Sequence, residues 1–209
     1  LSRLVKELHM SLAFSQACEN NKSPILSVLN SVLSDSTKVL EIGSGTGQHG
    51  VYFAEKLPHL TWLTSDLEVN HPSILARIAH SKLPNIHKPL TLDLNKQWHH
   101  LKSSAVDAVF TANTLHIVSI SLVNNFFEML STHLLKDGIL CIYGPFKYDG
   151  KFTSASNEGF NYWLQERDKD SGVRDFEYIV KLASNAGLTL INDHVMPANN
   201  QLLVFRKTH

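Results

Sequence analysis

A short apolar run that leads into alternating glycines constrains the fold of this chain more than any other feature. The run V-L-E-I at 39–42 favours a buried strand. Gly43, Gly45 and Gly47 follow, and they permit positive φ and close approach of a ligand to the backbone. Residues 48–57 have an apolar side typical of a helix. A strand, a glycine turn and a helix N-terminus in this order predict a nucleotide-type site, because free N–H groups and the helix dipole face the ligand.

Two kinds of ligand fit this loop. Residues 45–50 satisfy G-x-G-x-x-G, which predicts a nicotinamide dinucleotide. Glu41 favours a ligand with an ammonium group instead, because its carboxylate would repel a pyrophosphate. Asp66 follows the strand predicted at 60–65 and is placed to accept hydrogen bonds from ribose hydroxyls, which both ligands carry. The simpler alternatives are a tight turn without a ligand at the glycines and a helix cap at Asp66.

Length and composition are those of an ordinary globular protein. The 209 residues suffice for one domain spanning 1–209, and the equal numbers of basic and acidic side chains, 19 of each, disfavour a nucleic-acid partner. Cys18 and Cys141 lie far apart and predict neither a disulfide framework nor a metal site, which fits a reducing, cytoplasmic setting. No apolar run reaches the ~18 residues of a membrane span.

Strands and helices alternate along the rest of the chain. A helical cover is predicted over 1–36, as a short amphipathic helix in 1–16 and a second helix that begins after a polar break, with Ser23 as N-cap and Pro24 as its first residue. Turn-rich residues 144–175 are expected to form an insertion near the site. The other expected elements are strands 60–65, 90–92, 106–112 and 139–143, helices 72–79, 122–134 (stopped near Gly138), 157–166 and 176–186, and a hairpin of strands 188–196 and 201–205.

Five β/α alternations followed by a hairpin predict an α/β fold, a three-layer sandwich with a mostly parallel sheet and an antiparallel strand at its end. In such sheets the ligand lies beyond the carboxyl ends of the strands, where the strand order reverses. Asn113 and His116 follow the strand 106–112 and therefore belong to the mouth of the site. The insertion and the turn at 197–200 are expected to reach the same edge.

Several further segments fit one family pattern together with the glycine loop. They are Glu19, 21–22, 24–26, 39–50, 65–66, 143–146, 156–157, 174–175 and 196–200. In these segments the chain resembles a small uncharacterised family of class I S-adenosylmethionine (SAM)-dependent methyltransferase-like proteins, formerly termed a domain of unknown function. Gly43 and Gly50 depart from the pattern, which leads us to expect alanine at both positions; glycine is also small, so the departure leaves cofactor binding intact.

The resemblance implies a Rossmann-like methyltransferase fold with seven strands in the order 3-2-1-4-5-7-6, and SAM as cofactor. It implies that Glu41 serves the methionine end of SAM and that Asp93 holds the adenine amine, although a turn role for Asp93 fits its local sequence equally well. The expected cofactor-binding residues are Glu41, Gly43, Ser44, Gly45, Thr46, Gly47, Asp66, Asp93 and Asn113.

Methyl transfer requires mainly the alignment of acceptor and methyl group, with a base where the acceptor must lose a proton. His116 is the best-placed histidine for that role and Tyr143 is the second candidate, while a purely structural His116 is an equal alternative. The acceptor is expected to be a small molecule with an anionic or strongly hydrogen-bonding group. The residues expected to bind it are Asn21, Phe146, Asn157, Arg167, Arg174, Asn199 and Asn200; for any one of them a local role, such as pairing of Arg174 with Asp170 or Asp175, is the simpler alternative.

The sequence therefore predicts a SAM-dependent methyltransferase that acts on a small-molecule acceptor. A protein that binds SAM without transferring its methyl group is the first alternative. An NAD(P)-dependent oxidoreductase is the second, and Glu41, Asp93 and the terminal hairpin count against it.

Overall fold

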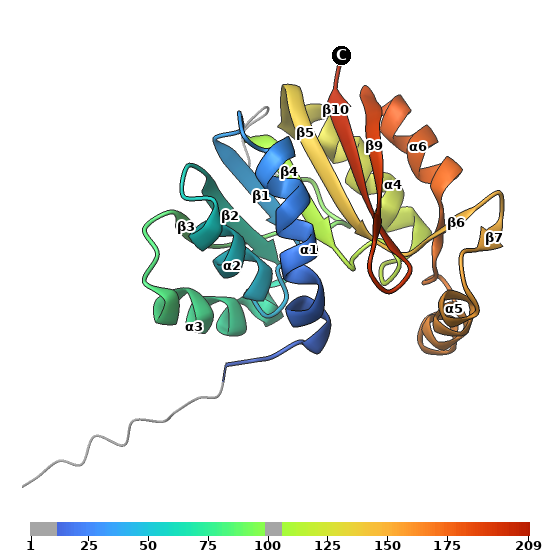
Figure 1. Ribbon diagram of the computed structural model, residues 1–209, viewed down its shortest axis with the longest axis horizontal. Helices are drawn as coiled ribbons and strands as arrows, with labels where there is room; N and C mark the ends of the chain where they lie inside the picture. The colour runs from blue at the N-terminus through green and yellow to red at the C-terminus, as the bar shows by residue number, and fades with distance from the viewer. Residues whose placement is uncertain (1–11, 99–105) are drawn as a thin grey trace, which may run out of the picture.

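The computed structural model describes residues 12–98 and 106–209 and shows a three-layer α/β sandwich (Figure 1). Its central sheet has seven strands in the order β3-β2-β1-β4-β5-β10-β9, which confirms the predicted order. The helices are α1 (Gln16–Val32), α2 (Gln48–Lys56), α3 (His71–Ser81), α4 (Ile120–His133), α5 (Ala155–Arg167) and α6 (Phe176–Asn185), with a 3-10 turn at Glu68–Asn70. The strands are β1 (Lys38–Ile42), β2 (Thr61–Asp66), β3 (Ile86–Thr91), β4 (Val106–Ala112), β5 (Leu134–Gly144), β6 (Phe146–Tyr148), β7 (Lys151–Phe152), β8 (Arg174–Asp175), β9 (Leu188–Met196) and β10 (Asn200–Lys207).

The first strand lies inside the sheet and separates two apolar cores. β1 pairs in parallel with β2 and β4. Helices α1 and α2 cover one face of the sheet and α4 and α6 the other (Figure 1). Val39 belongs to the core with residues of α1 and α2, whereas Leu40 and Ile42 belong to the core with residues of α4 and α6. A strand that is covered on both faces reads as a nearly continuous apolar run, which is why 39–42 were recognisable in the sequence.

The terminal hairpin belongs to the central sheet. β10 lies antiparallel between β5 and β9, where Leu203 pairs with Ile142 of β5 and with Asp193 of β9. Leu202, Leu203 and Phe205 are fully buried. These contacts confirm the predicted antiparallel end of the sheet.

The polar break predicted before Pro24 is wrong. α1 begins at Gln16, with Ser15 as its N-cap, and it passes through Pro24 without ending. One face of this helix is buried at Asn21, Ile25 and Leu29, which are spaced four residues apart. The apolar pattern misses the first turns because their buried position is an asparagine. Of the amphipathic helix predicted in 1–16, residues 1–11 lie outside the described residues, and 12–15 are not helical.

The helix predicted to stop near Gly138 ends earlier, at His133. Leu134 already has extended backbone and pairs with Val106 of β4, so burial in the sheet ends the helix there. Positive φ occurs at Asp137, not at Gly138. A Cβ at Gly138 would lie 2.7 Å from Leu134 Cδ1, which indicates that tight packing requires this glycine.

The 144–175 insertion is more ordered than its turn-rich sequence indicates. It contains α5 and a second, three-stranded sheet with the order β7-β6-β8. Phe146 pairs with Arg174 within this sheet. Strands of two or three residues leave no periodic pattern, so they were not predictable.

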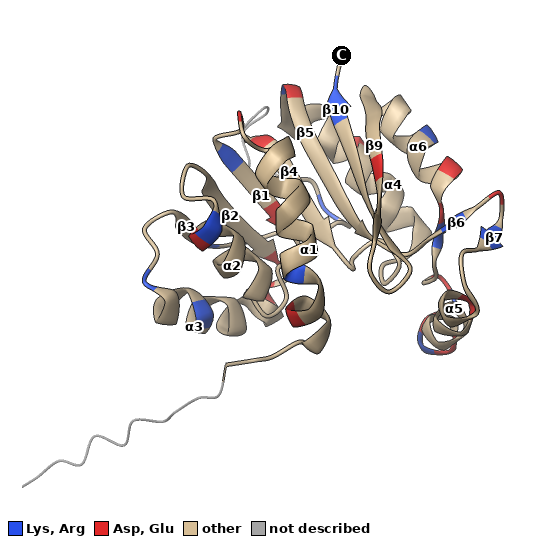
Figure 2. Cartoon of the chain, viewed as in Figure 1, with Lys and Arg blue, Asp and Glu red and all other residues tan. Residues whose placement is uncertain are grey.

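Charged side chains of both signs are interspersed over the described elements (Figure 2). Within the described part of the chain, none of the helices has both the length and the apolar character needed to span a membrane.

Candidate functional site

The glycine loop between β1 and α2 holds its backbone open. Gly43, Gly45 and Gly47 all have positive φ, at 75°, 55° and 73°. Gly47 is the N-cap of α2 and provides no side-chain cap. A Cβ at Gly45 would have no neighbour closer than 4.0 Å, whereas a Cβ at Gly43 would lie 2.7 Å from Thr114 Oγ1. The loop thus presents bare backbone at a helix N-terminus, the arrangement that suits a polar ligand.

Asp66 at the end of β2 joins the second strand to the glycine loop. Its Oδ2 accepts a 2.7 Å hydrogen bond from the backbone N–H of Gly45. Its Oδ1 accepts 2.7 Å hydrogen bonds from the backbone of Leu67 and from Asn70 Nδ2. Since a carboxylate has about four acceptor positions, Oδ2 retains capacity for one more donor, such as a ribose hydroxyl.

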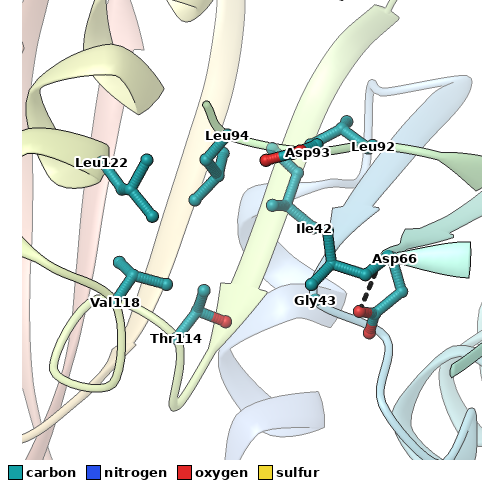
Figure 3. Close-up of a pocket in the computed structure, with 10 residues that line it drawn as sticks. Ile42, Gly43, Asp66, Leu92, Asp93, Leu94, Thr114, Val118 and Leu122 are labelled. Carbon is teal, nitrogen blue, oxygen red and sulfur yellow. Dashed lines mark hydrogen bonds between the residues drawn. The ribbon is translucent and has the colours of Figure 1, made fainter. Parts of the chain in front are cut away.

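A cavity of about 140 Å³ lies beside Gly43 and Asp66 (Figure 3). Its wall is mostly apolar and comes from Ile42, Leu67, Leu92, Leu94, Val118 and Leu122, with Thr114 and Asp93 at its polar points. Asp93 also makes local contacts, because its Oδ1 accepts from Asn95 N–H at 2.9 Å and its Oδ2 pairs with Lys96 Nζ at 3.3 Å. A mostly apolar cavity that begins at an acidic strand end suits a nucleoside.

Glu41 lies behind the glycine loop on the other side of the sheet and does not line this cavity. It is buried, and its Oε2 accepts hydrogen bonds from Trp62 Nε1 at 3.0 Å and Ser44 Oγ at 2.9 Å. Burial raises the pKa of Glu41 to about 7, against the opposing effect of these two donors. A Cβ at Gly50 would lie 2.6 Å from Glu41 Oε2, which gives a steric reason for glycine where alanine was expected.

Asn113 and His116, expected at the mouth, follow β4, and Tyr143, the second candidate base, lies near the end of β5. Asn113 has φ of 56°, and its N–H donates to the carbonyl of Tyr143 at 2.9 Å. His116 is buried, and burial, together with the charge of Arg174, lowers the pKa of its ring to about 4. Burial raises the pKa of Tyr143, while a side-chain hydrogen bond with Asn21 acts in the opposite direction.

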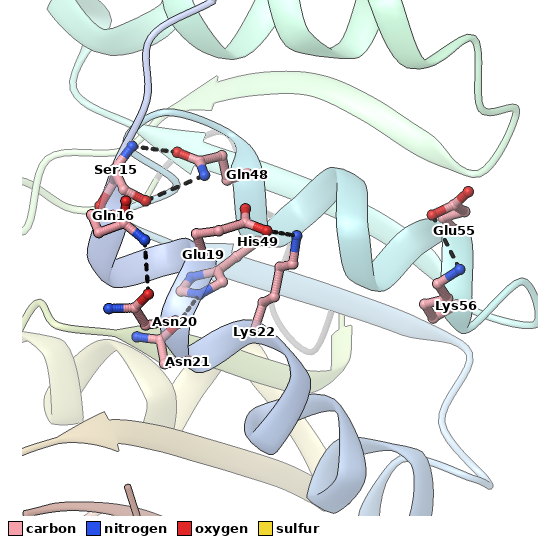
Figure 4. Close-up of polar contacts among 10 residues, drawn as sticks. All are labelled: Ser15, Gln16, Glu19, Asn20, Asn21, Lys22, Gln48, His49, Glu55 and Lys56. Atoms are coloured by element: carbon pink, nitrogen blue, oxygen red, sulfur yellow. Dashed lines mark hydrogen bonds and ion pairs between the residues drawn. The ribbon is translucent and has the colours of Figure 1, made fainter. Parts of the chain in front are cut away.

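The asparagines expected to bind an acceptor fall into two groups. Asn21 on α1 bonds through Oδ1 to His49 Nε2 at 2.6 Å, which joins α1 to α2 (Figure 4). Asn157 on α5 donates to the carbonyl of Asn199 at 2.8 Å and so ties the insertion to the hairpin turn. Asn200 donates to the carbonyls of Pro197 and Ala198 within that turn. The insertion and the hairpin therefore meet, as the sequence predicted, although these particular side chains bind protein groups.

Two of the residues expected to bind an acceptor, Phe146 and Arg174, instead contact other parts of the protein. Phe146 is buried in the core with α4 and α6. Arg174 donates through Nε to the carbonyl of Leu115 at 2.9 Å and through an Nη to those of Val118 and Asp170. Its guanidinium thus holds the loop after β4, which corrects the expectation that it offers a free fork to an anion. Among the described residues, Arg174 forms no ion pair with the carboxylates of Asp170 or Asp175, which were the alternative partners. It binds Asp170 through the backbone carbonyl, and Asp175 pairs with Lys147 at 3.2 Å.

Sequence reasoning missed most of the apolar wall of the cavity. Leu67 and Leu94 each follow an acidic residue that was selected, Asp66 and Asp93. The remaining missed residues are Ile42, Leu92, Thr114, Val118 and Leu122, and the last three are spaced four residues apart across the β4–α4 loop and the start of α4. That spacing was the available signal, but only Leu122 was considered, as part of the helix predicted at 122–134.

The N-terminal end of α1 is tied to the glycine loop (Figure 4). The Ser15 N–H donates to Gln48 Oε1 at 2.6 Å, and Gln48 Nε2 donates to the Ser15 carbonyl at 3.3 Å. Arg77 on α3 donates to the carbonyl of Thr46 at 2.8 Å and also to that of Ala13. The helical cover therefore contacts the loop directly.

This fold and loop define the class I methyltransferase fold, and solved structures agree. An O-methyltransferase family protein from Burkholderia thailandensis is similar with a TM-score of 0.78 at 17% identity, over 90% of this chain and 56% of that one. Human N-acetylserotonin methyltransferase in complex with SAM is similar with a TM-score of 0.76 at 14% identity, over 92% of this chain and 53% of that one. The O-methyltransferase NcsB1 from neocarzinostatin biosynthesis, in complex with SAM and 2-hydroxy-5-methyl naphthoic acid, has a TM-score of 0.73 at 13% identity, over 90% of this chain and 54% of that one. The chain thus spans about half the length of these proteins.

The chain belongs to the family described as "protein of unknown function (DUF938)", which it matches over residues 12–207. The family and the fold thus confirm the resemblance seen in the sequence.

Proposed function

We propose that this protein is a SAM-dependent methyltransferase that acts on a small-molecule acceptor. The observation that carries the proposal is Asp66, which is fixed beside the open backbone of Gly45 and lines a cavity with an apolar wall. Such an arrangement supplies a ribose acceptor next to a slot for a flat base. The likeness to methyltransferase folds supports the same choice of cofactor.

The described residues fit the parts of SAM. Asp66 would accept hydrogen bonds from the ribose, and Leu67, Leu94 and Val118 would cover the adenine, with Asp93 at its amine. The methionine part would lie along 43–47, where the bare glycine backbone leaves room. Glu41 lies behind Ser44 and would attract the ammonium group of SAM without touching it. The positive charge of that group would in turn favour the ionised form of the Glu41 carboxylate.

When bound, SAM would supply an electrophilic methyl group on a sulfonium for in-line transfer to a lone pair of the acceptor. The residues of the chain align the acceptor and remove its proton. His116 is neutral near pH 7 because burial lowers its pKa to about 4, so its ring is free to take a proton but holds it weakly. A carboxylic acid suits such a weak base because it is already ionised near pH 7, whereas a phenol, with a pKa of about 10, would need His116 only as its oxygen bonds to the methyl group.

Binding of SAM without transfer is the second candidate, and the burial of His116 and Tyr143 favours it. Both side chains are enclosed by protein, and Tyr143 has a raised pKa that opposes its ionisation. The strand order and the terminal hairpin do not match a dinucleotide-binding domain, so the nicotinamide alternative is not retained.

Thermal unfolding in the presence of SAM, S-adenosylhomocysteine or NAD tests the cofactor. A ligand at 100 times its Kd adds ~2.7 kcal/mol to the unfolding free energy. For a domain of this size that raises Tm by roughly 5–10 °C. We expect this rise with SAM and S-adenosylhomocysteine. A rise with NAD alone, or with none of the three at millimolar concentration, would contradict the proposal.

Incubation with methyl-labelled SAM and a library of phenols and carboxylic acids then separates transfer from binding. Label that moves to a library member supports the enzyme. Stabilisation by SAM without transfer to any library member would support the binding protein.

A further inference from the structure

A second cavity, of about 320 Å³, lies next to the loop that follows β4. It is bounded by Ile117 from this loop and by Phe160, Trp163, Leu164 and Arg167 from α5. Ile117 and Trp163 are 55% and 48% exposed, which is unusual for side chains of this size and marks an apolar surface open to a ligand. Its volume is in the range of small-molecule sites.

The two cavities share the β4–α4 loop as a wall. Thr114 and Val118 line the cavity assigned to SAM, while Ile117 faces the second cavity. His116, in the same loop, packs its ring edge-on against Phe160 of the second cavity, with centroids 5.3 Å apart. The second cavity therefore lies at the carboxyl edge of β4, where the fold delivers a reacting group.

The lining of the second cavity favours a flat, apolar ligand body. The rings of Phe160 and Trp163 stack with centroids 5.8 Å apart and an interplanar angle of 18°, so they form one aromatic surface. Aromatic rings bind other rings in offset or edge-on stacking, which adds to the gain from burial.

The charge at the rim favours an anion. The Arg167 guanidinium lies over the Trp163 ring, with Cζ 4.5 Å from the centroid, and it takes part in no ion pair within 12–98 and 106–209. Asp168 also lines the cavity, but its Oδ1 accepts the N–H of Asp170 at 3.0 Å, so this oxygen is engaged by its own loop. A guanidinium held on a ring face keeps N–H donors at its edge for a carboxylate.

We propose that this cavity binds the methyl acceptor as a planar aromatic acid, with its ring on Phe160 and Trp163 and its carboxylate at Arg167. The role of the acid as methyl acceptor rests on the proposed function. Its binding in this cavity does not depend on that function. The reacting atom of such a molecule would lie on the side of the cavity formed by Ile117 and Phe160, against which the His116 ring packs.

The test is calorimetric titration of the full chain with 2-naphthoate, in the presence and absence of S-adenosylhomocysteine. 2-Naphthalenemethanol serves as the uncharged probe and cyclohexanecarboxylate as the non-aromatic one. The variants are Arg167→Gln and Trp163→Leu, with Arg206→Gln, an exposed arginine on β10, as the matched control. Melting curves show that each variant is folded.

We expect 2-naphthoate to bind more tightly than either other probe. Arg167→Gln should weaken it about five-fold, the effect of one exposed charge pair, and leave 2-naphthalenemethanol unchanged. Trp163→Leu should weaken both aromatic probes, and Arg206→Gln neither. Equal affinity in all proteins, or no binding by the parent at millimolar concentration, would overturn the inference even if SAM binds. If the protein binds 2-naphthoate but not SAM, the inference that this cavity binds an aromatic acid stands, and the proposal that SAM is the cofactor is refuted.

Discussion

The backbone N–H of Gly45 donates a 2.7 Å hydrogen bond to Oδ2 of Asp66, so the residue assigned to the ribose also holds the glycine loop. The two residues are far apart in the sequence and meet because β1 and β2 are parallel neighbours. Loop shape and ligand binding therefore depend on the same carboxylate.

Asp66→Asn should weaken SAM binding ten-fold or more, because hydrogen bonds to a charged group contribute ~1.5–3 kcal/mol. The measurement is calorimetric titration with SAM. Asp107→Asn is the matched control, since Asp107 accepts three hydrogen bonds from Thr37 and Lys38 at the opposite end of β1. That variant should lose stability but keep its SAM affinity. Equal SAM affinity in Asp66→Asn and the parent would remove Asp66 from the site.

Glu41→Gln should change how stability depends on pH. The pKa of Glu41 is raised to about 7 in the fold, so its contribution is fully present below its ordinary pKa of 4.5 and is lost as pH rises through 7. The loss is on the order of 3 kcal/mol. Urea unfolding at several pH values between 4 and 8 should show the difference between variant and parent growing in favour of the variant as pH rises. A constant difference would contradict the raised pKa, and exposed Glu55→Gln controls for the charge change.

Gly43→Ala should destabilise the fold, although alanine was expected at this position. A residue with Cβ at φ of 75° costs ~1–2 kcal/mol, and the added Cβ would lie 2.7 Å from Thr114 Oγ1. Thr114→Ala removes the second cost but not the first. Urea unfolding of both single variants and the double variant should therefore show partial recovery in the double variant. If the two effects simply add, the close contact is not the cause.

Arg174→Leu should destabilise the protein by ~2–4 kcal/mol, because it leaves the carbonyls of Leu115 and Val118 without their donor. The loop that these carbonyls belong to lines both cavities, so ligand affinity should fall as well. Arg206→Leu, at an exposed position near the end of β10, is the control and should change stability by less than ~0.5 kcal/mol. An Arg174→Leu variant with the melting temperature of the parent would restore the option of a free anion-binding arginine.

Most of the fold was predictable because its signals are local. The strands at 39–42 and 106–112 each carry a mostly apolar run, and the glycine turn has alternating glycines; the structure has β1 and β4 at these two runs. The start of α1 was missed because Asn21 replaces an apolar residue in its buried stripe, and its partner His49 belongs to another helix.

The site was less predictable because its residues have long-range partners. Asp66 was found from its spacing to the glycines, which the parallel fold fixes. Arg174 was assigned to a ligand because its sequence gives no sign that Leu115 and Val118, more than fifty residues away, present carbonyls to it. Backbone acceptors have no signature in side-chain patterns.

The bonds from Ala13 and Ser15 to Arg77 and Gln48 have a practical consequence for experiments on this protein. Cleaving the chain after Ser15, or fusing a bulky tag there, would remove the bonds of Gln48 to Ser15 and of Arg77 to Ala13, and leave both side chains held beside the glycine loop only through Thr46. Such a sample would fold around the same sheet but report a weakened cofactor affinity. Ligand assays should therefore keep the residues before α1 and carry any purification tag beyond Lys207, where β10 ends.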